Sequence, residues 1–168
     1  MIDKSKVNSF DVIVIGAGAS GMMAAVSAAR LGAGTLLIEK NDALGKKLLL
    51  TGGGRCNLTS ADNRDELLAQ IPVNGKFLYS SMANFDNKDI MDFFSSGGLK
   101  LKIEDNGRVF PVTDSSKSIV EFFELKLKSY GVKLKTASAV AEILQRNGKV
   151  YGVRTKQGEE FYAKCVIV

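Results

Sequence analysis

The sequence contains no histidine, and its two cysteines, Cys56 and Cys165, lie far apart without a Cys-x-x-Cys spacing. Histidines and paired cysteines are the usual ligands of structural zinc, and a Cys-x-x-Cys pair is the usual dithiol redox centre. The sequence therefore argues against both, and no metal site is predicted. Without a disulfide pattern, we expect a protein of the reducing cytoplasm.

Long apolar runs and blocks of one charge are missing as well. No stretch reaches the ~18 apolar residues of a membrane span, and the first ten residues lack an apolar signal core. The net charge is +5, from 23 Lys and Arg against 18 Asp and Glu, but no run has five or six like charges. We expect neither a membrane nor a nucleic acid as partner. A length of 168 residues predicts one domain, 1–168.

The 17 glycines cluster at 16–21, 32–34 and 52–54, which indicates specific turns. The first cluster follows the β-branched run 12–15, typical of a buried parallel strand. An alanine-rich helix over 20–31 and a strand over 35–39 come next. Strand, helix and strand form one right-handed βαβ unit.

The glycine turn in this unit has the spacing Gly-x-Gly-x-x-Gly, formed by Gly16, Gly18 and Gly21. In a dinucleotide site, these glycines allow a tight turn, close approach of a pyrophosphate, and packing of the helix on the strand. Glu39 follows 18 residues after Gly21, near the position of an acid that binds ribose hydroxyls. Because this acid would repel a 2′-phosphate, NADP is disfavoured. The alternative is a turn of purely structural origin.

A second glycine loop runs from Thr51 to Asn57, with Arg55 inside it and Lys46 and Lys47 before it. Three glycines expose backbone N–H groups and remove bulk, which suits a flat ring or a phosphate. NAD-type domains have no need of such a loop, so it favours FAD. The alternative is a surface loop without a ligand. We expect residues 46–50 to be a turn or short strand.

Further elements are expected along the rest of the chain. They are a hairpin turning at 105–107, a helix from Ser115 or Ser116 to Gly131, and short strands at 132–136, 140–144, 150–155, 160–162 and 165–168. The last of these is typical of a central parallel strand, with Cys165 in the core. The predicted fold is a Rossmann-like α/β domain, with a parallel sheet, helices and a small antiparallel meander.

The motifs DVIVIGAGASGMMAA, GKKLLLTGGGRCNLT and NGRVFPVTDSSKSIVEFF resemble a bacterial flavoprotein family. Its members are NAD(P)/FAD-dependent oxidoreductases of the BaiN/RdsA type and include aminoacetone oxidase. The resemblance covers residues 10–168 and implies FAD, bound without a covalent link. It implies cofactor contacts from Gly16, Ala17, Gly18, Ser20, Gly21, Glu39, Lys40, Lys47, Thr51, Gly52, Gly53, Gly54, Arg55, Cys56, Asn57 and Val140.

Each group of these residues has an implied role. The first glycine turn would hold the pyrophosphate, and Glu39 and Lys40 would meet the adenosine ribose. Lys47 and residues 51–57 would line the inner pyrophosphate and the flavin, and the Val140 backbone would meet adenine. No catalytic acid, base or nucleophile is assignable from the sequence.

Members of that family are more than twice as long, so we expect an N-terminal fragment that lacks their insertion and C-terminal regions. The expected function is the FAD-binding portion of a flavin-dependent oxidoreductase, with hydride transfer through the flavin N5. NAD(P)H and a small-molecule substrate are the further partners implied for the full-length protein. The alternative is a non-catalytic FAD-binding fragment, or an inactive remnant, with no turnover.

Overall fold

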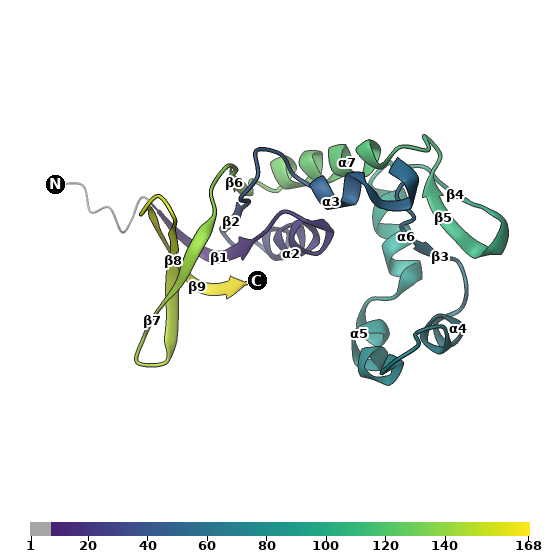
Figure 1. The fold of residues 1–168 in the computed structure, drawn as a ribbon, viewed down its shortest axis with the longest axis horizontal. Coiled ribbons are helices and arrows are strands. Elements are labelled where there is room, and N and C mark those ends of the chain that lie inside the picture. Colours follow the sequence, from purple (N-terminus) through teal and green to yellow (C-terminus); the bar gives the residue numbers. More distant parts are fainter. Residues whose placement is uncertain (1–7) are drawn as a thin grey trace. The chain divides into compact units, whose positions relative to one another are not determined.

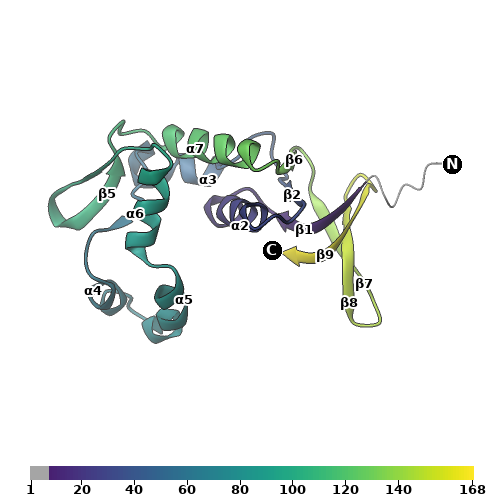
Figure 2. The ribbon, with the colours of Figure 1, turned by 180° about the vertical axis from the view of Figure 1, so that it is seen from behind.

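The computed structural model describes residues 8–168, which divide into two compact units. The first unit holds the residues up to Leu48 and Phe123–Val168, and the second holds Leu49–Phe122. Figure 1 and Figure 2 show the elements of each from opposite sides.

The first unit is built on a six-stranded sheet in the order β6-β2-β1-β9-β8-β7. Strands β6, β2, β1 and β9 are parallel, whereas β9, β8 and β7 form an antiparallel meander that continues the same sheet. Helix α2 contacts β1 and β2 and can be followed beside them in Figure 1. The elements wholly within this unit are β1 (Ser9–Ile15), α2 (Ala19–Arg30), β2 (Thr35–Ile38), β6 (Lys133–Lys135), β7 (Val140–Arg146), β8 (Lys149–Thr155) and β9 (Glu160–Ile167).

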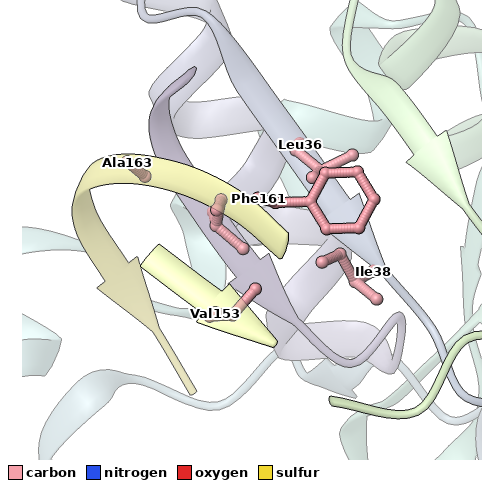
Figure 3. Packing of buried hydrophobic residues seen from close by; sticks show 6 residues of the cluster. Leu36, Ile38, Val153, Phe161 and Ala163 are labelled. Carbon is pink, nitrogen blue, oxygen red and sulfur yellow. The ribbon is translucent and has the colours of Figure 1, made fainter. Parts of the chain in front are cut away.

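The core of this sheet comes from residues that are far apart in the sequence. Ile13 and Leu36 pair across β1 and β2, and Val153, Phe161 and Ala163 of the meander belong to the same buried cluster. Figure 3 shows the Phe161 ring beside Leu36 and the neighbouring Ile38. Burial of these side chains on one surface holds the parallel strands and the meander together.

The second unit contains a small antiparallel sheet in the order β3-β5-β4 and several short helices. Two helices begin at side-chain caps, because Asn63 and Asp86 each form a capping box. Its elements are the 3₁₀ turn Thr51–Gly54, β3 (Thr59–Ser60), α4 (Arg64–Ala69), the 3₁₀ turn Gly75–Leu78, α5 (Tyr79–Asn84), α6 (Asn87–Ser96), β4 (Leu101–Ile103), the 3₁₀ turn Asp105–Gly107 and β5 (Arg108–Pro111). Two helices cross the unit boundary along the chain, α3 (Lys46–Leu49) and α7 (Ser116–Ser129).

The Rossmann-like α/β fold is confirmed, including the βαβ unit and the hairpin around residues 105–107. Three details are wrong. Residues 46–49 form a helix instead of a strand or turn. The expected strands 160–162 and 165–168 are one strand, β9, since it pairs with both β8 and β1. Cys165 is exposed and not in the core, because no described element covers it.

None of the described helices is long and apolar enough to cross a membrane.

Candidate functional site

The first glycine turn joins β1 to α2. A Cβ atom on Gly21 would lie 1.8 Å from the carbonyl oxygen of Gly16, so only glycine lets the helix begin this close to the strand. Gly16 has a φ of +95°, a conformation that residues with a side chain rarely adopt. The geometry of the chain itself therefore requires two of the three glycines.

Gly18 is not explained in this way. Its φ of −76° and ψ of −177° are open to any residue, and no described atom beyond its immediate neighbours lies within 4 Å of a Cβ built on it. Gly18 is also the N-cap of α2, where no described side chain caps the helix. A phosphate here would accept from first-turn N–H groups, and the helix dipole would stabilise its charge. The open space over Gly18 therefore fits a pyrophosphate.

The carboxylate of Glu39 lies against this turn, at the carboxyl end of β2. Its Oε2 accepts from the Ala17 N–H at 2.7 Å. Its Oε1 accepts from the backbone N–H and the side-chain amide of Asn41, at 2.9 and 2.6 Å. The Gly45 N–H donates to the Ala17 carbonyl. This network fixes the acid beside the turn that would hold the phosphates.

The pKa of Glu39 follows from opposing causes. Burial raises this pKa, but the hydrogen bonds from Ala17 and Asn41, with the charge of Lys40, lower it by more, so it lies below its ordinary 4.5. The carboxylate is therefore ionised at neutral pH, although only 7% of Glu39 is exposed. An ionised carboxylate accepts from ribose hydroxyls and repels a 2′-phosphate.

The segment before β7 lies beside Glu39. The Ser138 N–H donates to the Glu39 carbonyl at 2.9 Å, and the Ala137 N–H donates to the Asn41 carbonyl at 2.7 Å. Val140 begins β7 two residues later. Ser138 is 2% exposed, and its hydroxyl has no partner among the described residues. The structure thus brings the predicted adenine contact to the neighbourhood of the predicted ribose contact.

The second glycine loop, in the second unit, requires its glycines for a different reason. Gly52, Gly53 and Gly54 all have positive φ, at +56°, +65° and +86°, and Cys56 follows at +61°. A Cβ on Gly52 would also lie 2.8 Å from the backbone nitrogen of Asn57. The run of glycines is required because the backbone stays in the left-handed region.

The Arg55 side chain is held by its own unit. Its Nη1 lies 2.8 Å from Glu104 Oε1 and 3.4 Å from Asp114 Oδ1. Lys102 pairs with the same two carboxylates, and the Arg55 guanidinium lies 4.2 Å from the centre of the Phe110 ring. Hydrogen bonds from the two cations lower the pKa values of Glu104 and Asp114. Two carboxylates and a ring face thus anchor this guanidinium.

Two further loop residues have structural contacts. Cys56 is buried, and burial raises the pKa of its thiol, which makes the reactive thiolate scarce at neutral pH. Asn57, with its amide nitrogen turned toward the two carbonyls, donates to Thr59 at 2.9 Å and to Val109 at 3.2 Å. These bonds tie the loop to β3 and β5.

The predicted site residues therefore fall into two groups. The first unit brings together the glycine turn, Glu39 and the start of β7, with Lys40 and Lys47 exposed on the same unit. The other predicted residues, 51–57, form one loop of the second unit. Sequence reasoning missed Asn41. Its signal was an amide two residues after the acid, in the turn that leaves β2.

A parallel βαβ unit, a glycine turn with open space over its middle glycine and an ionised acid after the second strand define a dinucleotide-binding domain of the Rossmann type. The chain belongs to the family described as HI0933-like protein Rossmann domain, whose model matches residues 10–168. The predicted resemblance to a flavoprotein family is confirmed, and FAD is the cofactor of this domain.

Two curated relatives show the range of the family. The chain is 34% identical over 160 residues to 3-dehydro-bile acid delta(4,6)-reductase of Clostridium scindens, covering 92% of this chain and 37% of that protein. It is 29% identical over 159 residues to the ribosomal RNA dihydrouridine synthase of Haemophilus influenzae, covering 93% and 39%. The chain thus spans less than two fifths of the length of either relative.

Solved structures share the fold. The 3-ketosteroid delta1-dehydrogenase of Sterolibacterium denitrificans superimposes with a TM-score of 0.72 at 15% identity, covering 95% of this chain and 47% of that chain. Sdh1 of Mycobacterium smegmatis superimposes with a TM-score of 0.70 at 20% identity, covering 95% and 34%. At such identities the likeness shows the fold alone.

Proposed function

We propose that this chain is the FAD-binding portion of a flavin-dependent oxidoreductase, and that its first unit holds the ADP half of the cofactor. The open space over Gly18 carries the proposal, because nothing in residues 8–168, the described part of the chain, explains a glycine there. The residues of the turn, Gly16, Ala17, Gly18, Ser20 and Gly21, would hold the pyrophosphate. Glu39 and Lys40 would meet the ribose, and the Val140 backbone would meet adenine.

The second glycine loop and Lys47 are proposed as the further FAD-contacting segment. The left-handed run at residues 52–54 supports this role, because successive N–H groups in such turns form anion-binding concavities. Since Arg55 is engaged by Glu104 and Asp114, we assign the contact to the loop backbone. The guanidinium stays with these two carboxylates, and the bonds of Asn57 hold the shape of the loop.

When bound, the flavin supplies hydride transfer at its N5. The chain's own residues bind and orient the cofactor, and the ionised Glu39 favours an unphosphorylated ribose. NAD(P)H as electron donor and a cytoplasmic location belong to the proposal. The word reductase in one relative's name supports NAD(P)H as the electron donor. The two free thiols support the cytoplasmic location. The relatives' names give different substrates, so no substrate is assigned.

Titration of the purified chain with FAD, followed by quenching of flavin fluorescence, tests the proposal. We expect the Gly18→Ala variant to keep the melting temperature of the wild type and to lose at least tenfold in FAD affinity, about 1.4 kcal/mol. A wild-type chain that gives neither quenching nor a yellow protein fraction would exclude FAD binding by this chain.

Gly32→Ala is the matched control. Gly32 ends α2 with a φ of +87°, also with open space around it, so alanine there strains the backbone far from the turn. This variant should melt at a lower temperature and bind FAD with unchanged affinity. Equal affinity losses in the two variants would indicate a general defect and contradict the assignment of Gly18.

Two other expectations need their own measurements. A steady-state oxidase or reductase assay separates the oxidoreductase from the non-catalytic alternative, since turnover by this chain alone would exclude an inactive remnant. We expect no nucleic-acid partner for this chain, whereas one relative's name refers to ribosomal RNA. Salt-dependent retention of the chain on an RNA column would contradict it.

A further inference from the structure

We propose that Asn41 is a specificity-determining residue, which recognises the adenosine ribose together with Glu39. In this inference, which rests on the proposed function, the two vicinal ribose hydroxyls donate to two different side chains. One donates to Glu39 Oε2 and the other to Asn41 Oδ1. The ribose diol is thus recognised by a carboxylate–amide pair and not by a carboxylate alone.

The hydrogen-bond capacity of the Glu39 carboxylate carries the first step. An ionised carboxylate offers about four acceptor positions, two on each oxygen. Oε1 accepts from two donors of Asn41, and Oε2 accepts from the Ala17 N–H. Three positions are therefore occupied, and the remaining one is on Oε2. The carboxylate can accept from one ribose hydroxyl without losing a bond, but not from two.

The side-chain amide of Asn41 supplies the second acceptor. Its nitrogen donates to Glu39 Oε1 at 2.6 Å, which orients the amide. Among the described residues, nothing donates to its Oδ1, which has two lone pairs. The side chain is half-buried, whereas only 7% of Glu39 is exposed. The Asn41 residue is thus the more accessible of the two.

The backbone around Asn41 is held on two sides. The Asn41 N–H donates to Glu39 Oε1, and the Asn41 carbonyl accepts from the Ala137 N–H at 2.7 Å. These bonds do not depend on the Asn41 side chain, so a substitution there leaves them in place. A site preorganised in this way loses little freedom when a ligand binds.

The test compares three nucleotides on the full chain by calorimetric titration, namely ADP, 2′-deoxy-ADP and 3′-deoxy-ADP. The wild type should bind ADP at least fivefold more tightly than either deoxy nucleotide. In Asn41→Ala, one of the two deoxy nucleotides should bind as tightly as ADP within twofold, while the other keeps its wild-type penalty. Glu39→Ala also removes the oxygen that orients the Asn41 amide, so this variant should lose the preference for ADP over both deoxy nucleotides.

Controls separate this role from other effects. Asn84→Ala removes an exposed amide that donates to Ser80 in the second unit, and it should leave all three affinities unchanged. If Asn41→Ala fails to fold, Asn41→Leu removes the side-chain amide while filling the space, and the same pattern is expected. Equal losses for all three nucleotides, or no loss, in the Asn41 variant would overturn the inference. A wild type that binds neither FAD nor ADP would instead overturn the proposed function.

Discussion

The two glycine-rich regions of this chain look alike in the sequence but use glycine for different reasons. In the turn Gly16–Gly21, one glycine prevents a clash, one adopts positive φ, and Gly18 does neither. In the loop Thr51–Asn57, all three glycines adopt positive φ. Only the first region contains a glycine that the protein's own geometry leaves unexplained, so only Gly18 points by itself to a ligand.

The charges near the two regions differ in a similar way. Glu39 beside the first turn keeps one acceptor position after its bonds to Ala17 and Asn41. Arg55 in the second loop is paired with Glu104 and Asp114. A charged residue near a glycine turn is therefore evidence of a ligand only to the extent that its partners leave it free.

The largest effect that the comparison predicts is on stability, at Gly21. In Gly21→Ala, the new methyl group would stand 1.8 Å from the Gly16 carbonyl, so the helix must move away from the strand. Overpacking costs about 1–3 kcal/mol, and contact with rigid backbone places this variant at about 3 kcal/mol. Urea unfolding followed by circular dichroism measures it.

Gly18→Ala, three residues away, is the control for that measurement and should unfold at the wild-type urea concentration. A Gly21→Ala variant as stable as the wild type would mean that close helix–strand packing does not explain this glycine. The distinction between Gly21 and Gly18 would then be lost.

The next largest effect is on FAD affinity, where substitution of Glu39 is compared with substitution of Arg55. We expect Glu39→Gln to weaken FAD binding about tenfold, because hydrogen bonds to a charged group contribute about 1.5–3 kcal/mol and a neutral amide retains only part of this. Arg55→Gln should weaken it less than about threefold, because the guanidinium is engaged by Glu104 and Asp114. Fluorescence titration of both variants with FAD gives the ratio. A larger loss in the Arg55 variant would show that this side chain contacts the cofactor itself.

Much of the first region could be predicted from the sequence because local spacing specifies it. Gly16, Gly18, Gly21 and Glu39 belong to one βαβ unit, whose hydrophobic pattern predicts its strands and helix. The position of Asn41 relative to the Glu39 oxygens depends on side-chain geometry in a turn, which spacing does not encode. Its bonds were therefore missed.

The second region was less predictable because its contacts are distant in sequence. Arg55 meets Glu104 and Asp114, which lie about fifty to sixty residues further along the chain. No periodicity connects such positions. The exposure of Cys165 has a similar cause, since an apolar strand pattern shows that a strand can be buried but not what covers it.

A smaller effect on stability is predicted at Gly53, in the second loop. Gly53 has open space around it and a φ of +65°, so Gly53→Ala meets no clash and suffers only from the left-handed backbone, at about 1–2 kcal/mol. Urea unfolding should place this variant between Gly18→Ala and Gly21→Ala. Wild-type stability would mean that the loop adopts another backbone conformation and would weaken the contrast between the regions.

The smallest effect is the acid dependence of stability that Glu39 contributes. Its pKa in the folded chain lies below the ordinary 4.5, so its ionised form stabilises the fold above that value. This contribution is lost as the pH falls through the lowered pKa. Melting temperatures of the wild type and Glu39→Gln, measured from pH 7 to pH 3, should differ by a few degrees at neutral pH and converge below pH 4.5.

Glu104→Gln is the comparison from the second region, because hydrogen bonds from Arg55 and Lys102 also lower the pKa of Glu104. Salt at 1 M should reduce the Glu104 effect more than the Glu39 effect, since salt screens the partly exposed ion pairs of Glu104 more than the buried hydrogen bonds of Glu39. Equal salt sensitivity of the two would show that Glu39 is held by charge and not by the hydrogen bonds of the first turn.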